Sequence, residues 1–196
     1  MNLILETDIG HDPDDFFALC YLHSSVVNII AIVVSPGHTY QLSIVRAFCK
    51  KVGLNIPIGY AKRSKIPYNN YFHKEIISSM GYNLEDSGDG YGEEIIKETL
   101  QKFPDCEVFI CGPLLNFGKY FELNKDHYLK KVTMQGGFLP YNQHNYDVIK
   151  LDKFIGKSMV STFNLNESKK YGLYLIQEAN IEDLRFVGKN VCHTIV

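Results

Sequence analysis

Residues 2–15 read NLILETDIGHDPDD, an apolar, β-biased stretch that leads directly into a cluster of glycine, proline and aspartate. From Pro13 onward the pattern is helical, with acidic residues in the first turn, where the helix dipole favours negative charge. A continuous β-branched run, Ile29–Val34, is typical of a strand buried on both faces. Two apolar strands joined by one helix form a βαβ unit, so we expect the first strand, Asn2–Glu6, to lie inside a parallel sheet beside Ile29–Val34.

Strand-like and helix-like segments continue to alternate along the chain. This alternation predicts a single α/β domain over residues 1–196, built of βαβ units with a parallel sheet. Further helices are predicted after the turn at Gly112-Pro113 and at Gln41–Val52, Gly92–Phe103 and Lys153–Val160. The remaining segments are predicted as a polar loop at Phe138–Asp152 and as strands at Ile56–Tyr60, Glu107–Cys111, Lys131–Met134, Leu173–Ile176 and Phe186–Val187.

Composition and charge exclude several classes of protein. Of the 196 residues, 45% are hydrophobic and 21% are charged, values typical of a soluble globular protein. The net charge of −2 provides no basic field for a nucleic acid, which argues against such a partner. The longest apolar run, Val26–Val34, is too short to cross a membrane, and the N-terminus has no signal-peptide pattern. Five cysteines without paired zinc-type spacing indicate reduced thiols, so we expect a cytoplasmic protein.

Four aspartates occur within eight residues, directly after the first predicted strand: Asp8, Asp12, Asp14 and Asp15. Ligands of open α/β sheets bind at the carboxyl ends of the strands. Massed carboxylates repel one another and raise one another's pKa, and a hard divalent cation with oxygen ligands removes that cost. Capping of the following helix accounts for only one or two of the four aspartates. The cluster therefore predicts a Ca²⁺ or Mg²⁺ site.

The segment ETDIGHDPDDFFAL, residues 6–19, resembles the opening motif of the nucleoside hydrolases, the inosine–uridine-preferring N-ribohydrolases. Glu6 stands for the first acid of that motif, and two residues are inserted before its last aspartates. Other segments resemble family motifs in the same order: Ile56–Ile58, Gly88–Gly92, Cys111–Asn116, Met134–Gly137, Thr162–Asn164 and Phe186–His193. The resemblance covers essentially the whole chain. It implies a nucleoside hydrolase-like fold, a mostly parallel, mixed open sheet flanked by helices. It also implies Ca²⁺-dependent hydrolysis of the N-glycosidic bond of a ribonucleoside or related N-riboside.

The resemblance also implies roles for individual residues. Asp8 and Asp15 resemble metal ligands, and Leu115 would supply a backbone carbonyl to the same metal. Asp14 resembles the general base that takes a proton from the attacking water, although the inserted Asp12 is an alternative for the place of either aspartate. The residues that fall where the family binds ribose are His38, Asn164 and Asn142.

Family members are longer than this chain, and their additional C-terminal part carries a histidine–aspartate pair of the site. We therefore expect a fold that is short at its C-terminus, in which His144, Asp147 and His193 are the candidates to compensate. Two alternative functions stay open. One is a non-catalytic homologue that binds a nucleoside or a metal, and the other is a fragment active only with a missing C-terminal half. A shortened fold exposes apolar surface, so we expect a homo-oligomer or a partner chain, with a small-molecule nucleoside as substrate.

Overall fold

The structure is a computed structural model that describes residues 1–10, 13–62, 78, 85–135, 164 and 168–187. Its strands are β1 Asn2–Thr7, β2 Asn28–Val34, β3 Ile58–Tyr60, β4 Gly90–Tyr91, β5 Glu107–Ile110, β6 Leu129–Gln135 and β7 Ile181–Val187. They form one sheet in the order β4-β3-β2-β1-β5-β6-β7, and every neighbouring pair is parallel. The carboxyl ends of these strands therefore lie at one edge of the sheet.

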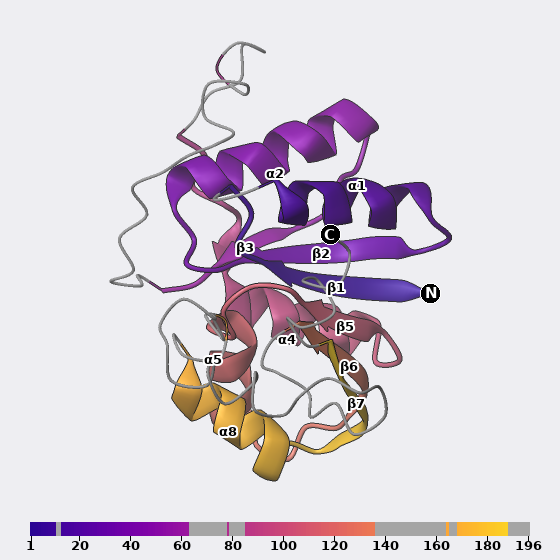
Figure 1. The fold of residues 1–196 in the computed structure, drawn as a ribbon, viewed down its shortest axis with the longest axis vertical. Coiled ribbons are helices and arrows are strands. Elements are labelled where there is room, and N and C mark those ends of the chain that lie inside the picture. The colour runs from indigo at the N-terminus through magenta and orange to yellow at the C-terminus, as the bar shows by residue number, and fades with distance from the viewer. Residues whose placement is uncertain (11–12, 63–77, 79–84, 136–163, 165–167, 188–196) are drawn as a thin grey trace, which may run out of the picture.

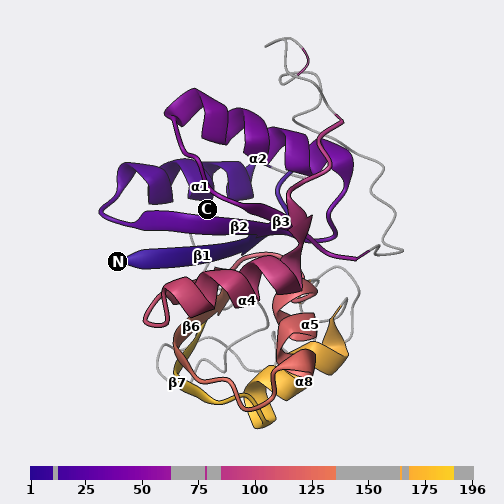
Figure 2. The same cartoon turned by 180° about the vertical axis from the view of Figure 1, so that it is seen from behind.

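Helices cover both faces of this sheet (Figures 1 and 2). The helices α1 (Asp14–Ser24) and α2 (Thr39–Val52) lie on one face. The opposite face is covered by α4 (Gly92–Lys102), α5 (Asn116–Leu123) and α8 (Lys169–Gln177). Among the described residues, none of the helices is both long enough and apolar enough to cross a membrane.

The sheet separates two hydrophobic cores. Its central strand β1 contributes to both, because successive side chains of a strand point to opposite faces. Ile4 belongs to the core beneath α4 and α5, and Leu5 belongs to the core beneath α1 and α2. Leu3 pairs with Ile29 of β2 on one side and with Glu107 of β5 on the other. This arrangement confirms the prediction that the first strand lies inside a parallel sheet, beside the β-branched run.

One predicted strand is wrong, because Leu173–Ile176 lies within helix α8. The four-residue apolar run is too short to distinguish a strand from a buried helix. The helix is favoured because Leu175 and Tyr171, one turn apart, both pack into the core beneath α5. This packing needs Gly118 of α5, since a Cβ there would lie 2.1 Å from the Tyr171 ring.

Other elements differ from their predicted bounds. The strand predicted at Phe186–Val187 is the end of the longer strand β7, and β4 was not predicted. A strand of two residues such as β4 is defined by its pairing with β3 rather than by a sequence pattern. The predicted loop Phe138–Asp152 and the predicted helix Lys153–Val160 lie outside the described residues.

Candidate functional site

The carboxylate of Asp15 joins three elements at the carboxyl edge of the sheet. Asp15 lies in the first turn of α1 and is only 9% exposed. Its Oδ1 accepts a hydrogen bond from Thr7 Oγ1 at 2.5 Å, at the end of β1. The same oxygen accepts a hydrogen bond from Cys111 Sγ at 2.9 Å, directly after β5. The structure thus fixes one oxygen of Asp15 from two strands.

The two predicted metal ligands, Asp8 and Asp15, lie together at this edge. Asp8 follows β1 directly and is half-buried, and Asp15 is hydrogen-bonded to Thr7 at the end of the same strand. Burial raises the pKa of Asp15 and the charge of Asp14 raises it further, while the hydrogen bonds from Cys111 and Thr7 lower it. Two carboxylates in contact are favourable only when they share a proton or a cation. Such a pair shares a proton, or holds a cation where further oxygen donors complete the ligand set.

Of the two predicted general bases, the structure describes only Asp14. Asp14 is the first residue of α1 and is exposed, and its Oδ1 accepts a hydrogen bond from Asp15 N at 3.0 Å. It lies beside the carboxylate pair along the chain and faces solvent, where a water molecule has access. The alternative base Asp12 lies outside the described residues.

Leu115 precedes α5, and its backbone already belongs to the first turn of that helix. Its carbonyl accepts a hydrogen bond from Lys119 N at 3.1 Å, so a cation would use the second lone pair of the oxygen. The connection from β5 to α5 packs tightly on the one that follows β1. A Cβ at Gly112 would lie 2.6 Å from Asp8 N. Glycine at this position therefore lets the two connections approach each other.

Two of the three predicted ribose-binding residues are described. Asn164 is buried, and its Nδ2 donates to Cys111 O at 2.7 Å and to Gln135 O at 3.3 Å, which places it at the ends of β5 and β6. His38 is half-buried before α2 and stacks on Tyr40, with ring centroids 5.9 Å apart. Asn142 lies outside the described residues, as do the compensating candidates His144, Asp147 and His193.

Gln41 is a residue of this edge that the sequence interpretation missed. It is fully buried, and its Nε2 donates to Asp8 O at 3.1 Å and to Ile9 O at 2.9 Å. Its Oε1 accepts a hydrogen bond from His38 N at 3.0 Å. One side chain thus joins the connections that follow β1 and β2. A glutamine in an amphipathic helix carries no sequence signal of such a role.

The carboxylate of Glu6 does not join the Asp8–Asp15 pair. As the neighbour of Thr7 in a strand, its side chain points to the opposite face, towards α5. There its Oε1 accepts hydrogen bonds from Ser35 Oγ at 2.5 Å and from Asn116 N at 2.8 Å. Burial raises the pKa of Glu6 to about 7, although these hydrogen bonds oppose the shift. The alternation of side chains along β1 therefore places the Glu6 carboxylate on the α5 side of the sheet, away from Asp8 and Asp15.

Within the part of the chain that the structure describes, no group of three or more His, Cys, Asp or Glu side chains is arranged to hold a metal ion. The candidate donors described here are two carboxylates and one carbonyl. The inserted acid Asp12 lies outside that part of the chain.

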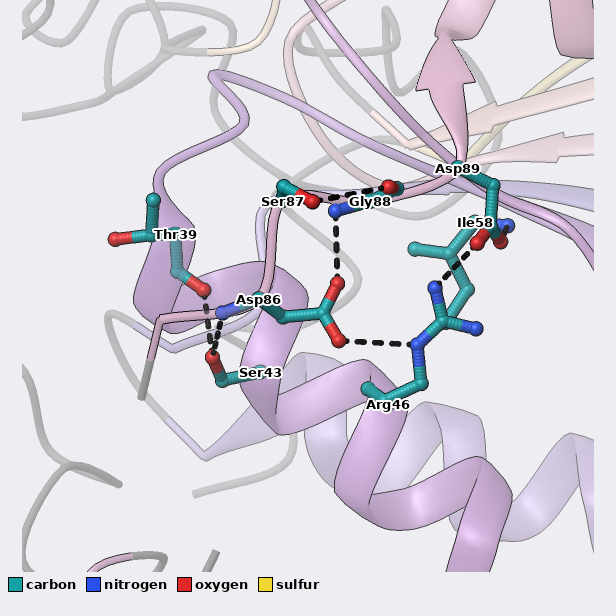
Figure 3. Close-up of polar contacts among 8 residues, drawn as sticks. All are labelled: Thr39, Ser43, Arg46, Ile58, Asp86, Ser87, Gly88 and Asp89. Carbon is teal, nitrogen blue, oxygen red and sulfur yellow. Dashed lines mark hydrogen bonds and ion pairs between the residues drawn. The ribbon is translucent and has the colours of Figure 1, made fainter. Parts of the chain in front are cut away.

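A second polar cluster surrounds Arg46 of α2 (Figure 3). Its guanidinium forms ion pairs with Asp86 at 3.0 Å and with Asp89 at 2.7 Å. Asp89 Oδ2 also accepts a hydrogen bond from Ile58 N at 2.7 Å, at the start of β3. Asp89 belongs to the Gly88–Gly92 segment that resembles a family motif. Here that segment anchors the amino ends of β3 and β4 to α2, away from the carboxyl edge.

Comparison of the sequence with models of known protein families finds no match, and comparison with curated proteins finds none either. Solved structures do match. An inosine–guanosine nucleoside hydrolase is 16% identical, with a TM-score of 0.62 over 95% of this chain and 59% of that one. The chain has the nucleoside hydrolase fold.

Two further solved structures share this fold. The inosine–uridine-preferring nucleoside hydrolase from Bacillus anthracis is 19% identical, with a TM-score of 0.54 over 74% of this chain and 54% of that one. The type III effector protein XopQ, solved with adenosine diphosphate ribose, is 13% identical, with a TM-score of 0.61 over 96% of this chain and 58% of that one. The chain thus spans a little over half the length of these three proteins.

Proposed function

We propose that this chain hydrolyses the N-glycosidic bond of a ribonucleoside or related N-riboside, with Ca²⁺ held at the carboxyl edge of its sheet. The observation that carries the proposal is the placement of Asp8, directly after β1, and of Asp15, hydrogen-bonded to Thr7 at the end of β1, on a sheet whose fold is that of nucleoside hydrolases. The reaction class comes from the names of structural neighbours, which include inosine–guanosine, inosine–uridine-preferring and purine-preferring hydrolases.

The donors at this edge suit a hard cation. Carboxylates of Asp8 and Asp15 and the carbonyl of Leu115 are oxygen donors of the kind that Ca²⁺ takes. A bound Ca²⁺ would supply Lewis-acid activation of water and binding of the ribose hydroxyls. Thr7 and Cys111 hold Asp15 Oδ1, so that neither donor engages Oδ2.

The chain's own residues would perform the remaining steps. Asp14, exposed beside the pair, would take the proton of the attacking water, or Asp12 would do so in its place. Cleavage of the glycosidic bond develops positive charge on the sugar, which the massed carboxylates of the edge would stabilise. His38, Asn164 and Asn142 would orient the ribose.

The second candidate function is binding of a riboside without hydrolysis. It is favoured by one observation, because XopQ shares this fold and its structure contains adenosine diphosphate ribose. A protein that only binds a riboside needs no general base. Variants of Asp14 would therefore leave riboside affinity unchanged, and no free base would form.

A calorimetric titration of the chelator-treated full chain with Ca²⁺ tests the metal site. We expect wild-type protein to bind in the micromolar to millimolar range and Asp15→Asn to lose at least tenfold in affinity. Asp105→Asn, which changes an exposed aspartate at the amino end of β5, is the matched control and should bind as wild type does. The absence of any binding heat in wild-type protein would remove the cation from the proposal.

Incubation of the same proteins with a panel of nucleosides then separates the two functions. Chromatography of the products measures the free base. Release of base by wild-type protein, and its loss in Asp14→Asn or Asp12→Asn, supports hydrolysis. Binding of Ca²⁺ and nucleoside with no release of base would leave the binding function.

A further inference from the structure

Two hydrogen bonds converge on a single oxygen of Asp15. Thr7 Oγ1 and Cys111 Sγ both donate to Oδ1, at 2.5 Å and 2.9 Å. The donors come from different strands, β1 and the end of β5, so the carboxylate is held from two directions. A carboxylate that is held in this way cannot rotate about its Cβ–Cγ bond without losing both bonds.

The hydroxyl group of Thr7 is itself oriented by a further hydrogen bond. Thr7 Oγ1 accepts a hydrogen bond from Ile9 N at 3.2 Å, which directs the hydroxyl hydrogen towards Asp15. The buried Cys111 thiol has one hydrogen and two acceptors within reach, and Asp15 Oδ1 at 2.9 Å is nearer than Glu6 O at 3.3 Å. A chain of hydrogen bonds from Ile9 N through Thr7 to Asp15 polarises each member in the same sense.

We propose that Cys111 and Thr7 are positioning residues that reserve the second oxygen of Asp15 for a cation. This inference rests on the proposed function, because it assigns these residues a role in the Asp8–Asp15 site. Thr7 and Cys111 both engage Oδ1, and neither engages Oδ2, which is the oxygen that the proposal assigns to the cation. Preorganisation of a ligand oxygen raises affinity because binding then costs less conformational entropy.

Cys111 is the more informative of the two residues. Its segment, Cys111–Asn116, was singled out by the resemblance only for the backbone carbonyl of Leu115. A buried free cysteine ordinarily behaves as a small hydrophobe, which makes no demand on hydrogen bonding. The contact with Asp15 requires instead a hydrogen-bond donor that points at Oδ1. A hydroxyl group can donate this bond, and a methyl group cannot.

The test compares Cys111→Ser with Cys111→Ala in the full chain. We expect Cys111→Ala to raise the Kd for Ca²⁺ about fivefold, the effect of losing one hydrogen bond worth about 1 kcal/mol. Cys111→Ser keeps a donor, so its Kd should stay within about twofold of the wild-type value. Thr7→Val and Thr7→Ser form a second pair with the same expected order.

The control separates positioning from packing. Cys106 is another buried cysteine, directly before β5, and burial, together with the charge of Asp105, raises its pKa. Cys106→Ala should lower the unfolding temperature of the chelator-treated protein as Cys111→Ala does, without changing the Kd for Ca²⁺. Equal Kd values for Cys111→Ala, Cys111→Ser and wild type would overturn the inference and leave the cation site intact. A wild-type protein that binds no Ca²⁺ would overturn both.

Discussion

The buried carboxylate of Glu6 accepts hydrogen bonds from both nitrogens of Asn116, from the backbone N at 2.8 Å and from Nδ2 at 3.0 Å. The two residues are 110 positions apart, and both are fully buried. Asn116 Nδ2 also donates to Val34 O at 3.1 Å. One buried pair thus joins β1, the end of β2 and the start of α5, which are the elements that position the carboxyl edge.

The first prediction concerns the pH dependence of stability. Burial raises the pKa of Glu6 from 4.5 to about 7, so the folded protein binds this proton more tightly than the unfolded chain does. The associated stability is fully present below pH 4.5 and is lost as pH rises through 7, by about 3 kcal/mol in total. The raised pKa of Asp15 acts in the same direction.

Urea unfolding of chelator-treated protein between pH 5 and pH 8 measures this effect. We expect the difference in unfolding free energy between wild type and Glu6→Gln to change with pH, in favour of wild type at the acidic end. Glu107→Gln, at the amino end of β5 and paired with Lys131, is the control. Its difference from wild type in unfolding free energy should not shift in favour of wild type at acidic pH. A pH-independent difference for Glu6→Gln would contradict the prediction.

The second prediction concerns Gly92, the first residue of α4. A Cβ at Gly92 would lie 2.0 Å from Asn116 Oδ1, a buried oxygen. Gly92→Ala must displace the Asn116 amide from Glu6, so it should destabilise the protein by about 1–3 kcal/mol. Gly90→Ala is the control, because its Cβ would meet no atom closer than 3.9 Å. Thermal unfolding of the two variants should differ clearly, and equal midpoints would refute this packing.

The third prediction concerns Gln41. Replacing it by alanine leaves Asp8 O and Ile9 O without their side-chain donor and frees the connection after β1. We expect a loss of about 1–3 kcal/mol in unfolding free energy, together with weaker Ca²⁺ binding. Gln101→Ala, on the exposed side of α4, should change neither quantity. Stability equal to that of wild type in Gln41→Ala would show that this link is unimportant.

The sequence predicts the strands of the sheet correctly where the apolar runs are long. The runs Asn2–Glu6 and Ile29–Val34 form adjacent parallel strands as expected, and Gly53 ends α2 in the left-handed conformation. Local patterns fail for β4 and α8, because a two-residue strand and a four-residue apolar run carry too little periodicity. Their structure is decided by packing partners that are distant in the sequence.

The candidate site was predictable only in part. The cluster of acids after β1 identifies the edge, and the resemblance identifies Asp8 and Asp15, which both lie at the carboxyl end of β1. The contact of Cys111 with Asp15 spans 96 positions, and no local pattern reveals it. The burial of Gln41 likewise depends on how two connections meet in the folded protein.

Cleavage of a nitrophenyl riboside tests the proposed hydrolysis most directly, because its leaving group needs no proton and the assay depends mainly on water activation. We expect nitrophenol release by the full chain with Ca²⁺, loss of release on chelation, and loss in Asp15→Asn while Asp105→Asn retains it. General acid catalysis is typically worth about 10²–10⁴-fold, so natural nucleosides should react more slowly unless another residue supplies the acid. No release of nitrophenol by a protein that binds Ca²⁺ would contradict the account and leave riboside binding as the function.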